Sequence, residues 1–124
     1  MAKILLAEDN RLTRLTLEQF LRSQGYSVDS AEDGAQALSL LNGTAFDLVI
    51  SDIVLPKVNG WDLLEHVSSI APNTPVLLMT AYSQVQPNER QLRATPELML
   101  KPFLLADFLS KIEQMLARKR SCYG

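Results

Sequence analysis

The sequence has 124 residues, a length that predicts one compact core, because two cores would each have too few residues to bury. Hydrophobic residues make up 47% and charged residues 21%, which excludes disordered, collagen-like and fibrous classes. Lys and Arg number 12 against 14 Asp and Glu, and the net charge of -2 is too weak to hold nucleic acid or an anionic membrane. We therefore expect a single globular domain over residues 1–124 that binds neither directly.

Three features of the sequence favour the cytoplasm. The single cysteine, Cys122, cannot form a disulfide within the chain. No stretch approaches the roughly 20 apolar residues of a membrane span. The N-terminal residues MAKILLAED reach acidic side chains too early for a signal peptide.

The first half of the sequence predicts two strands alternating with two helices. Residues 3–7 form a short apolar run, typical of a strand covered on both faces of a parallel sheet. Charged residues recur every three or four positions over residues 11–22, as on the solvent face of a helix. Residues 26–31 alternate apolar and polar side chains, which predicts a strand at a sheet edge, and residues 34–41 predict a second helix. Glycines suited to chain reversals follow the two helices, at Gly25 and Gly43.

The second half continues this alternation, which indicates an α/β fold. Further apolar runs predict strands buried on both faces at residues 46–50, 75–80 and 98–100. Residues 61–70 predict a helix, and apolar side chains repeat at helical spacing over residues 105–116. Residues 83–95 contain few apolar positions and a proline, which predicts at most a short helix starting near Asn88 and the most mobile part of the chain.

Chemically active side chains follow the predicted strands. In a parallel sheet with right-handed crossovers, the carboxyl ends of the strands meet at one edge, where ligands bind. The residues that end or follow the first, third, fourth and fifth strands are Glu8, Asp9, Asp52, Thr80 and Lys101. We therefore expect three carboxylates, one hydroxyl and one ammonium to share a single pocket.

This set of groups predicts chemistry on a phosphoryl group. Three carboxylates within a few ångströms repel one another unless a cation intervenes, and Mg²⁺ prefers oxygen ligands while keeping several waters. The hydroxyl of Thr80 and the ammonium of Lys101 could hold two oxygens of a tetrahedral anion. A carboxylate in the pocket could then be the nucleophile that receives a phosphoryl group.

Four short motifs, taken together, resemble a two-component response-regulator receiver domain. They are Glu8-Asp9, the run DIVLPKVNG over residues 52–60, Thr80-Ala81 and Lys101-Pro102-Phe103. Asp52 follows Asp9 by 43 residues, Thr80 follows Asp52 by 28 and Lys101 follows Thr80 by 21. Each motif alone is weak, but the ordered set is specific and covers nearly the whole chain. The resemblance implies a flavodoxin-like (βα)5 fold, a doubly wound parallel sheet with strand order 2-1-3-4-5.

The resemblance also implies a function and residue roles. Asp52 would accept a phosphoryl group from a sensor histidine kinase or a phosphotransfer protein, and the domain would then control a downstream effector or a missing output domain. Thr80 would bind the phosphoryl group and report its presence, Lys101 would pair with Asp52 or the phosphoryl oxygens, and the Lys101–Pro102 peptide would be cis. The implied Mg²⁺ ligands are Glu8, acting through water, Asp9, Asp52 and the backbone carbonyl of Val54. Such a protein is a regulator rather than an enzyme, apart from self-catalysed phosphotransfer and slow autodephosphorylation.

Two positions on the face through which members of this family usually signal depart from the family pattern. Leu98 stands three positions before the lysine, where the family usually carries an aromatic switch residue. Residues 83–95 also lack the usual apolar pattern and closing glycine of the helix expected there.

Two other function classes remain as alternatives to a phosphorylation switch. One is a degenerate receiver that only binds partners, against which the complete set of acid, hydroxyl and lysine argues. The other is a flavodoxin-like cofactor binder or an aspartate-nucleophile phosphatase. No Gly-rich or Ser/Thr-rich phosphate loop follows the first strand, and the phosphatase pattern would place its nucleophile there rather than at Asp52.

Overall fold

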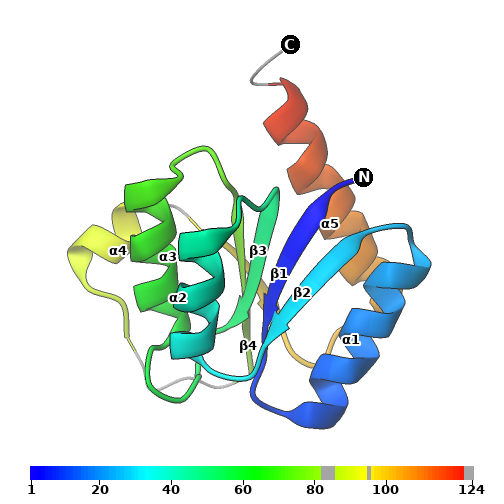
Figure 1. The fold of residues 1–124 in the computed structure, drawn as a ribbon, viewed down its shortest axis with the longest axis horizontal. Helices are drawn as coiled ribbons and strands as arrows, with labels where there is room; N and C mark the ends of the chain where they lie inside the picture. Colours follow the sequence, from blue (N-terminus) through cyan, green and yellow to red (C-terminus); the bar gives the residue numbers. More distant parts are fainter. Residues whose placement is uncertain (82–85, 95, 122–124) are drawn as a thin grey trace.

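The computed structural model describes residues 1–81, 86–94 and 96–121 (Figure 1). Strands and helices alternate along this described part of the chain. They are β1 (Lys3–Ala7), α1 (Arg11–Ser23), β2 (Ser27–Ala31), α2 (Gly34–Gly43), β3 (Leu48–Asp52), α3 (Gly60–Ile70), β4 (Val76–Thr80), α4 (Glu89–Arg93), β5 (Glu97–Leu100) and α5 (Leu105–Ser121). No helix in these residues is long and apolar enough to cross a membrane.

The five strands form one parallel sheet in the order β2-β1-β3-β4-β5, which confirms the topology that the family resemblance implies. The register pairs Ala7 with Ser51 and Asp52 with Met79, so β1, β3 and β4 end at nearly the same level. All strands run in the same direction, and their carboxyl ends therefore lie at one edge of the sheet.

Helices cover both faces of the sheet (Figure 1). The helices α2, α3 and α4 lie on one side, and α1 and α5 lie on the other. Alternate residues of β1 point to opposite faces, so Leu5 and Ala7 belong to the core under α2 and α3, whereas Ile4 and Leu6 belong to the core under α1 and α5. Burial on both faces explains why the central strands are continuously apolar.

Two strands differ from the sequence prediction. The third strand was expected at residues 46–50, but β3 covers Leu48–Asp52. Phe46 is buried in the core just before the strand, and the Asp47 carboxylate accepts a hydrogen bond from the backbone N–H of Lys3 at 2.8 Å. The apolar signal at Phe46 therefore comes from a loop residue. As a result, Asp52 is the last residue of β3 rather than a residue beyond it.

The prediction that the last strand is buried on both faces was wrong. β5 is an edge strand in which Leu98 is 50% exposed and Leu100 is 70% exposed. Its other face carries Met99, which packs on the core under α1 and α5. The expected edge position of the strand at residues 26–31 is confirmed, because β2 forms the opposite edge.

The helices begin at side-chain caps. Asn10, Asp33 and Asn59 precede α1, α2 and α3, and each side chain accepts a hydrogen bond from the backbone N–H three residues later. Gly25, with φ of 92°, turns the chain after α1 as expected. Gly43 does not reverse the chain, because it is the last residue of α2 and Thr44 is the C-cap.

The helix expected to start near Asn88 is present as α4, which has five residues. Of the weakly patterned segment 83–95, residues 83–85 and 95 lie outside the described residues.

Candidate functional site

The carboxyl edge of the sheet brings together the acidic residues predicted from the sequence. Glu8 and Asp9 follow β1, and Asp52 ends β3. One carboxylate oxygen from each of the three lies within 4.8 Å of the others. These three carboxylates are therefore close enough together to hold a metal ion.

Lys101 joins two of these carboxylates. Its Nζ atom lies 2.7 Å from Oε2 of Glu8 and 2.8 Å from Oδ2 of Asp52. The three side chains are shielded from water, with exposed fractions of 22% for Lys101, 1% for Glu8 and 14% for Asp52. The Lys101 backbone N–H donates to the Thr80 carbonyl at 2.7 Å, and the Lys101–Pro102 peptide is cis, as the resemblance implies.

Burial and the ion pairs act in opposite directions on the charges of this site. Burial raises the pKa of Glu8, and the nearby charge of Asp52 raises it further, while the hydrogen bond from Lys101 opposes the shift. Burial alone would lower the pKa of Lys101, but the hydrogen bonds and charges of Asp52 and Glu8 outweigh it and raise that pKa. Lys101 therefore remains a cation at neutral pH, and it cannot by itself neutralise three carboxylates.

Glu8 and Asp9 are adjacent in the sequence but have different environments. Glu8 is buried, and its two carboxylate oxygens accept hydrogen bonds from Lys101 and from the backbone N–H of Asn10, the latter at 3.1 Å. Asp9 is exposed. The carboxylate of Asp9 is therefore open to a metal ion, whereas that of Glu8 is engaged by the protein. This difference suits a direct metal ligand at Asp9 and a less direct role for Glu8.

A further residue, Arg14, positions this acidic turn and is missed by the sequence analysis. Its Nη1 atom donates a hydrogen bond to the carbonyl of Glu8 at 2.9 Å and a longer one to the carbonyl of Asp9 at 3.4 Å. Arg14 lies one helical turn after the N-cap Asn10, so its side chain can reach back over the start of α1. That spacing is the signal from which its role could have been predicted.

The loop between β3 and α3 is held against the start of α2. The backbone N–H of Gly34 donates to the carbonyl of Pro56 at 3.1 Å, and Nζ of Lys57 lies 3.3 Å from Asp33. Lys57 adopts a φ of 73°, in the left-handed region that a lysine rarely occupies. The same loop carries Val54, whose side chain is half exposed. The role of the Val54 carbonyl as a metal ligand remains a prediction.

Thr80 is the last residue of β4 and is partly exposed. Its carbonyl accepts the hydrogen bond from Lys101, which places Thr80 beside the lysine at the same edge as Asp52. The structure thus brings Thr80, Lys101 and the three acidic residues to the same edge of the sheet. The contact of the Thr80 hydroxyl with a phosphoryl group remains a prediction.

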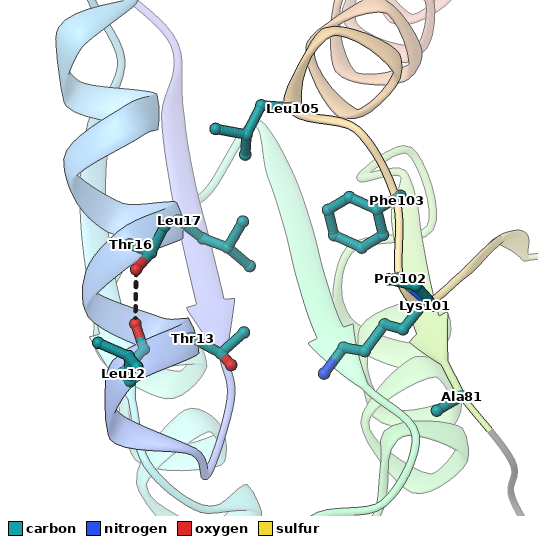
Figure 2. A pocket seen from close by; sticks show the side chains of 9 residues that line it. All are labelled: Leu12, Thr13, Thr16, Leu17, Ala81, Lys101, Pro102, Phe103 and Leu105. Atoms are coloured by element: carbon teal, nitrogen blue, oxygen red, sulfur yellow. Dashed lines mark hydrogen bonds between the residues drawn. The ribbon is translucent and has the colours of Figure 1, made fainter.

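A cleft of about 630 Å³ opens beside this site, between α1 and the segment that joins β5 to α5 (Figure 2). Figure 2 shows the side chains of α1 on one wall, and Lys101, Pro102 and Phe103 on the other. Leu12, which is 76% exposed, and Leu105 contribute to the lining. The cleft is mostly apolar, and its polar end is the lysine that binds Asp52.

The doubly wound five-stranded sheet defines a flavodoxin-like α/β fold with an acidic cluster and a lysine at its carboxyl edge, and comparison with known proteins gives the family. Residues 4–113 match the family described as the response regulator receiver domain. The chain belongs to this family.

Individual relatives agree with this assignment. The chain is 36% identical over 117 residues to the "Probable transcriptional regulatory protein SilR" of Salmonella typhimurium, covering 94% of this chain and 51% of SilR. It is 33% identical to the "Transcriptional regulatory protein CusR" of Escherichia coli strain K12, covering 94% of this chain and 52% of CusR. The chain thus spans about half the length of the curated relatives it matches.

A CheY-like response regulator receiver domain protein from Methanospirillum hungatei JF-1 has the same fold, with a TM-score of 0.90, 26% identity and coverage of 98% of both chains.

Proposed function

We propose that this chain is a phosphorylation switch that accepts a phosphoryl group on Asp52. The observation that carries the proposal is the placement of Asp52, whose Oδ2 atom is 2.8 Å from the Lys101 ammonium and whose carboxylate belongs to a cluster able to hold a metal ion. An aspartate side chain can act as the nucleophile that receives a phosphoryl group, and the Lys101 ammonium together with a bound cation would offset the negative charge of the transferring group.

In the proposed reaction, an Asp52 oxygen attacks phosphorus and forms an O–P bond. The bond that breaks is the N–P bond of a phosphohistidine, and its electron pair stays on the imidazole, which recovers a proton from water. Because Lys101 engages Oδ2 of Asp52, we assign the attack to Oδ1. Lys101 can then bind an oxygen of the transferred group, and we assign the Thr80 hydroxyl to another.

The donor set fits Mg²⁺. Asp9 and Asp52 offer carboxylate oxygens, Glu8 adds a buried negative charge beside them, and these are the hard ligands that Mg²⁺ prefers. We propose that Asp9, Asp52 and the Val54 carbonyl would hold the ion, with Glu8 acting through water. When bound, the ion supplies compensation for the negative charge that the carboxylates and the phosphoryl oxygens share.

In this proposal, the cleft between α1 and the segment that joins β5 to α5 is the approach for the donor. Its apolar walls end at Lys101, so a protein segment lying in the cleft would bring a histidine side chain near Asp52. A sensor histidine kinase or a phosphotransfer protein carries such a histidine, and we propose that one of them occupies the cleft during transfer.

Phosphorylation of Asp52 must then affect something outside this domain. SilR and CusR, which are about twice as long as this chain, are named transcriptional regulators. We propose that phosphorylation of Asp52 controls either a further segment of the same protein or a separate effector.

Intact-mass analysis tests the proposal. The purified chain is incubated with acetyl phosphate and magnesium, and in parallel with acetyl phosphate and a chelator. We expect the mass of one phosphoryl group to be added in the first sample, and little to be added with the chelator or in Asp52→Asn. An unchanged mass with a range of donors would instead favour a receiver that only binds partners.

A further inference from the structure

The helix α4 is too short to be stable by itself. It has five residues, Glu89–Arg93, whereas isolated helices of fewer than about 12 residues are marginal in water. Contacts with the rest of the protein must therefore hold it in place. The described contacts between α4 and its neighbour α3 are mainly polar, and one residue, Gln91, is central to them.

Gln91 is one of three buried polar or charged residues in the described part of the protein, and it is 4% exposed. Its Nε2 atom donates to Oδ1 of Asp62 at 3.0 Å and to Oε2 of Glu65 at 3.3 Å. Both acceptors are on α3, one helical turn apart. The two amide hydrogens of Gln91 are therefore shared between two carboxylates of the neighbouring helix.

The other end of the same side chain completes the start of α4. Oε1 of Gln91 accepts from the backbone N–H of Asn88 at 3.0 Å, and Oδ1 of Asn88 accepts from the backbone N–H of Gln91 at 2.9 Å. This reciprocal pair is a capping box. Gln91 thus joins the cap of α4 and the attachment of α4 to α3 in a single side chain.

The second link between the two helices is weaker. Nη1 of Arg90 lies 3.1 Å from Oε1 of Glu65, but the Arg90 side chain is 82% exposed. Exposed ion pairs contribute little, because water and salt screen them, whereas a buried hydrogen bond to a charged acceptor contributes more. Of the two described polar links between α4 and α3, the Gln91 hydrogen bonds are therefore the stronger.

Both helices that Gln91 joins, α3 and α4, adjoin residues of the Asp52 site, α3 in space and α4 along the sequence. The backbone N–H of Gly60, the first residue of α3, donates at 2.8 Å to the carbonyl of Ile53, the residue after Asp52. Along the chain, α4 follows Thr80, the residue to which we assign a phosphoryl contact. The helix is thus connected to the site through α3, and it follows β4 in the sequence.

We propose that Gln91 is a latch that docks α4 on Asp62 and Glu65, so that α4 is a two-state element, docked and helical or released and unfolded. The role of this latch in signalling rests on the proposed function. Phosphorylation of Asp52 would have to favour either the docked or the released state of α4. The latch itself is a property of the unphosphorylated protein and can be tested without a phosphoryl donor.

Gln91→Glu separates docking from capping. Glutamate has the same size, retains the acceptor oxygen for Asn88 and is favoured at this position of a capping box and near a helix N-terminus. It loses the amide hydrogens, however, and places a carboxylate against Asp62 and Glu65. If capping alone held α4, the substitution would leave the helix intact; if docking holds it, the helix is released.

Hydrogen exchange of the full chain, without a donor, measures the result. We expect amide exchange over residues 89–94 to be about tenfold faster in Gln91→Glu, with the sheet amides nearly unchanged. Gln36→Glu is the matched control, because Gln36 occupies the same position of α2 after the cap Asp33 and its side chain is exposed. We expect exchange over residues 89–94 in this control to equal that of the wild type.

A triple variant excludes a non-specific effect. In Gln91→Glu combined with Asp62→Asn and Glu65→Gln, the donor and acceptor roles are exchanged, and we expect slow exchange over residues 89–94 to return. Wild-type exchange in Gln91→Glu would overturn the latch, and so would fast exchange that persists in the triple variant. Neither outcome bears on whether Asp52 accepts a phosphoryl group, which the mass measurement decides separately.

Discussion

A Cβ atom on Gly60 would lie 2.6 Å from the carbonyl oxygen of Asp52 and 2.8 Å from the Cα atom of Ile53. Both neighbours are backbone atoms, which cannot move aside without moving the end of β3. Gly60 is therefore required by the close approach of α3 to the residue that we assign as phosphoacceptor, and not by its own backbone conformation.

Gly60→Ala is expected to destabilise the protein by about 2–3 kcal/mol, because the methyl group must push α3 away from β3. It should also slow phosphoryl uptake at Asp52. Gly43→Ala is the control: Gly43 lies in α2 with no atom within 4 Å of its would-be Cβ, and the change should stabilise by up to about 1 kcal/mol. Urea unfolding of both variants checks this, and equal effects would refute the packing argument.

Magnesium is expected to raise the melting temperature, because it binds the folded cluster of Glu8, Asp9 and Asp52 in preference to the unfolded chain. At a concentration one hundred times its Kd the gain would be about 2.7 kcal/mol. Asp9→Asn should respond less to magnesium, and in chelator it should melt above the wild type because one of the repelling charges is gone.

Thermal unfolding with magnesium or chelator measures both effects. Glu113→Gln, which removes an exposed carboxylate from α5, should retain the wild-type response to magnesium. A lower melting temperature of Asp9→Asn in chelator would contradict the account of charge repulsion.

Glu97 is expected to make the contact between β5 and α5 sensitive to acid. The Arg118 hydrogen bond, at 2.6 Å, lowers the pKa of Glu97; burial opposes this shift, and the hydrogen bond from Lys111 adds to it. Because the folded-state pKa lies below that of the unfolded chain, about 4.3, the stabilisation is present above that pH. It is lost as the pH falls through the lower, folded-state pKa.

Glu97→Gln should therefore be less stable than the wild type at pH 7, by about 1 kcal/mol or less since the partners are partly exposed, and the difference should disappear in acid. Urea unfolding at a series of pH values gives the two curves. Glu113 lies on α5, the helix that carries Lys111 and Arg118, and has no ion pair among the described residues, so Glu113→Gln should run parallel to the wild type. A constant difference between Glu97→Gln and wild type at all pH values would argue against this linkage.

The phosphoryl group is expected to be long-lived. Hydrolysis needs a water in line with phosphorus, and the half-exposed side chain of Val54, two residues after Asp52, offers no polar group to orient that water. Tyr82 follows Thr80 by the same interval and lies outside the described residues. Val54→Asn combined with Tyr82→Glu should shorten the lifetime about tenfold, or by about 1.4 kcal/mol of barrier.

The decay of phosphoprotein after removal of the donor, at fixed magnesium, measures the lifetime in the wild type and in the double variant. If the lifetime is unaltered or longer, another part of the site controls hydrolysis.

The sequence predicts the order of elements because buried strands and amphipathic helices leave different apolar periods. It places β3 two residues early because Phe46 is apolar and buried but precedes the strand. It also predicts burial for β5 on apolar content alone. Leu98 and Leu100 are instead on an edge strand, and their exposure depends on what the neighbouring elements cover, which composition does not encode.

The candidate site is likewise predicted in part from the sequence and in part only visible in the structure. Parallel topology suffices to predict that Asp52 and Lys101 meet, although they are far apart in the sequence. The sequence cannot distinguish buried Glu8 from exposed Asp9, because both follow β1. Gln91 was missed because its importance comes from contacts with α3, which its residue type does not indicate. For Arg14, only its spacing from the N-cap Asn10 could have indicated the contact with the Glu8–Asp9 backbone.

Mapping the phosphoryl group to a single residue shows whether Asp52 is the phosphoacceptor. Borohydride reduces an aspartyl phosphate to homoserine, so the chain phosphorylated with acetyl phosphate and magnesium is reduced, digested and mapped by mass spectrometry. We expect homoserine at position 52 and at no other position, and none without donor. Reduction at Asp9 or Glu8 instead, or phosphoryl uptake by Asp52→Asn equal to that of the wild type, would contradict the assignment of Asp52 as the phosphoacceptor.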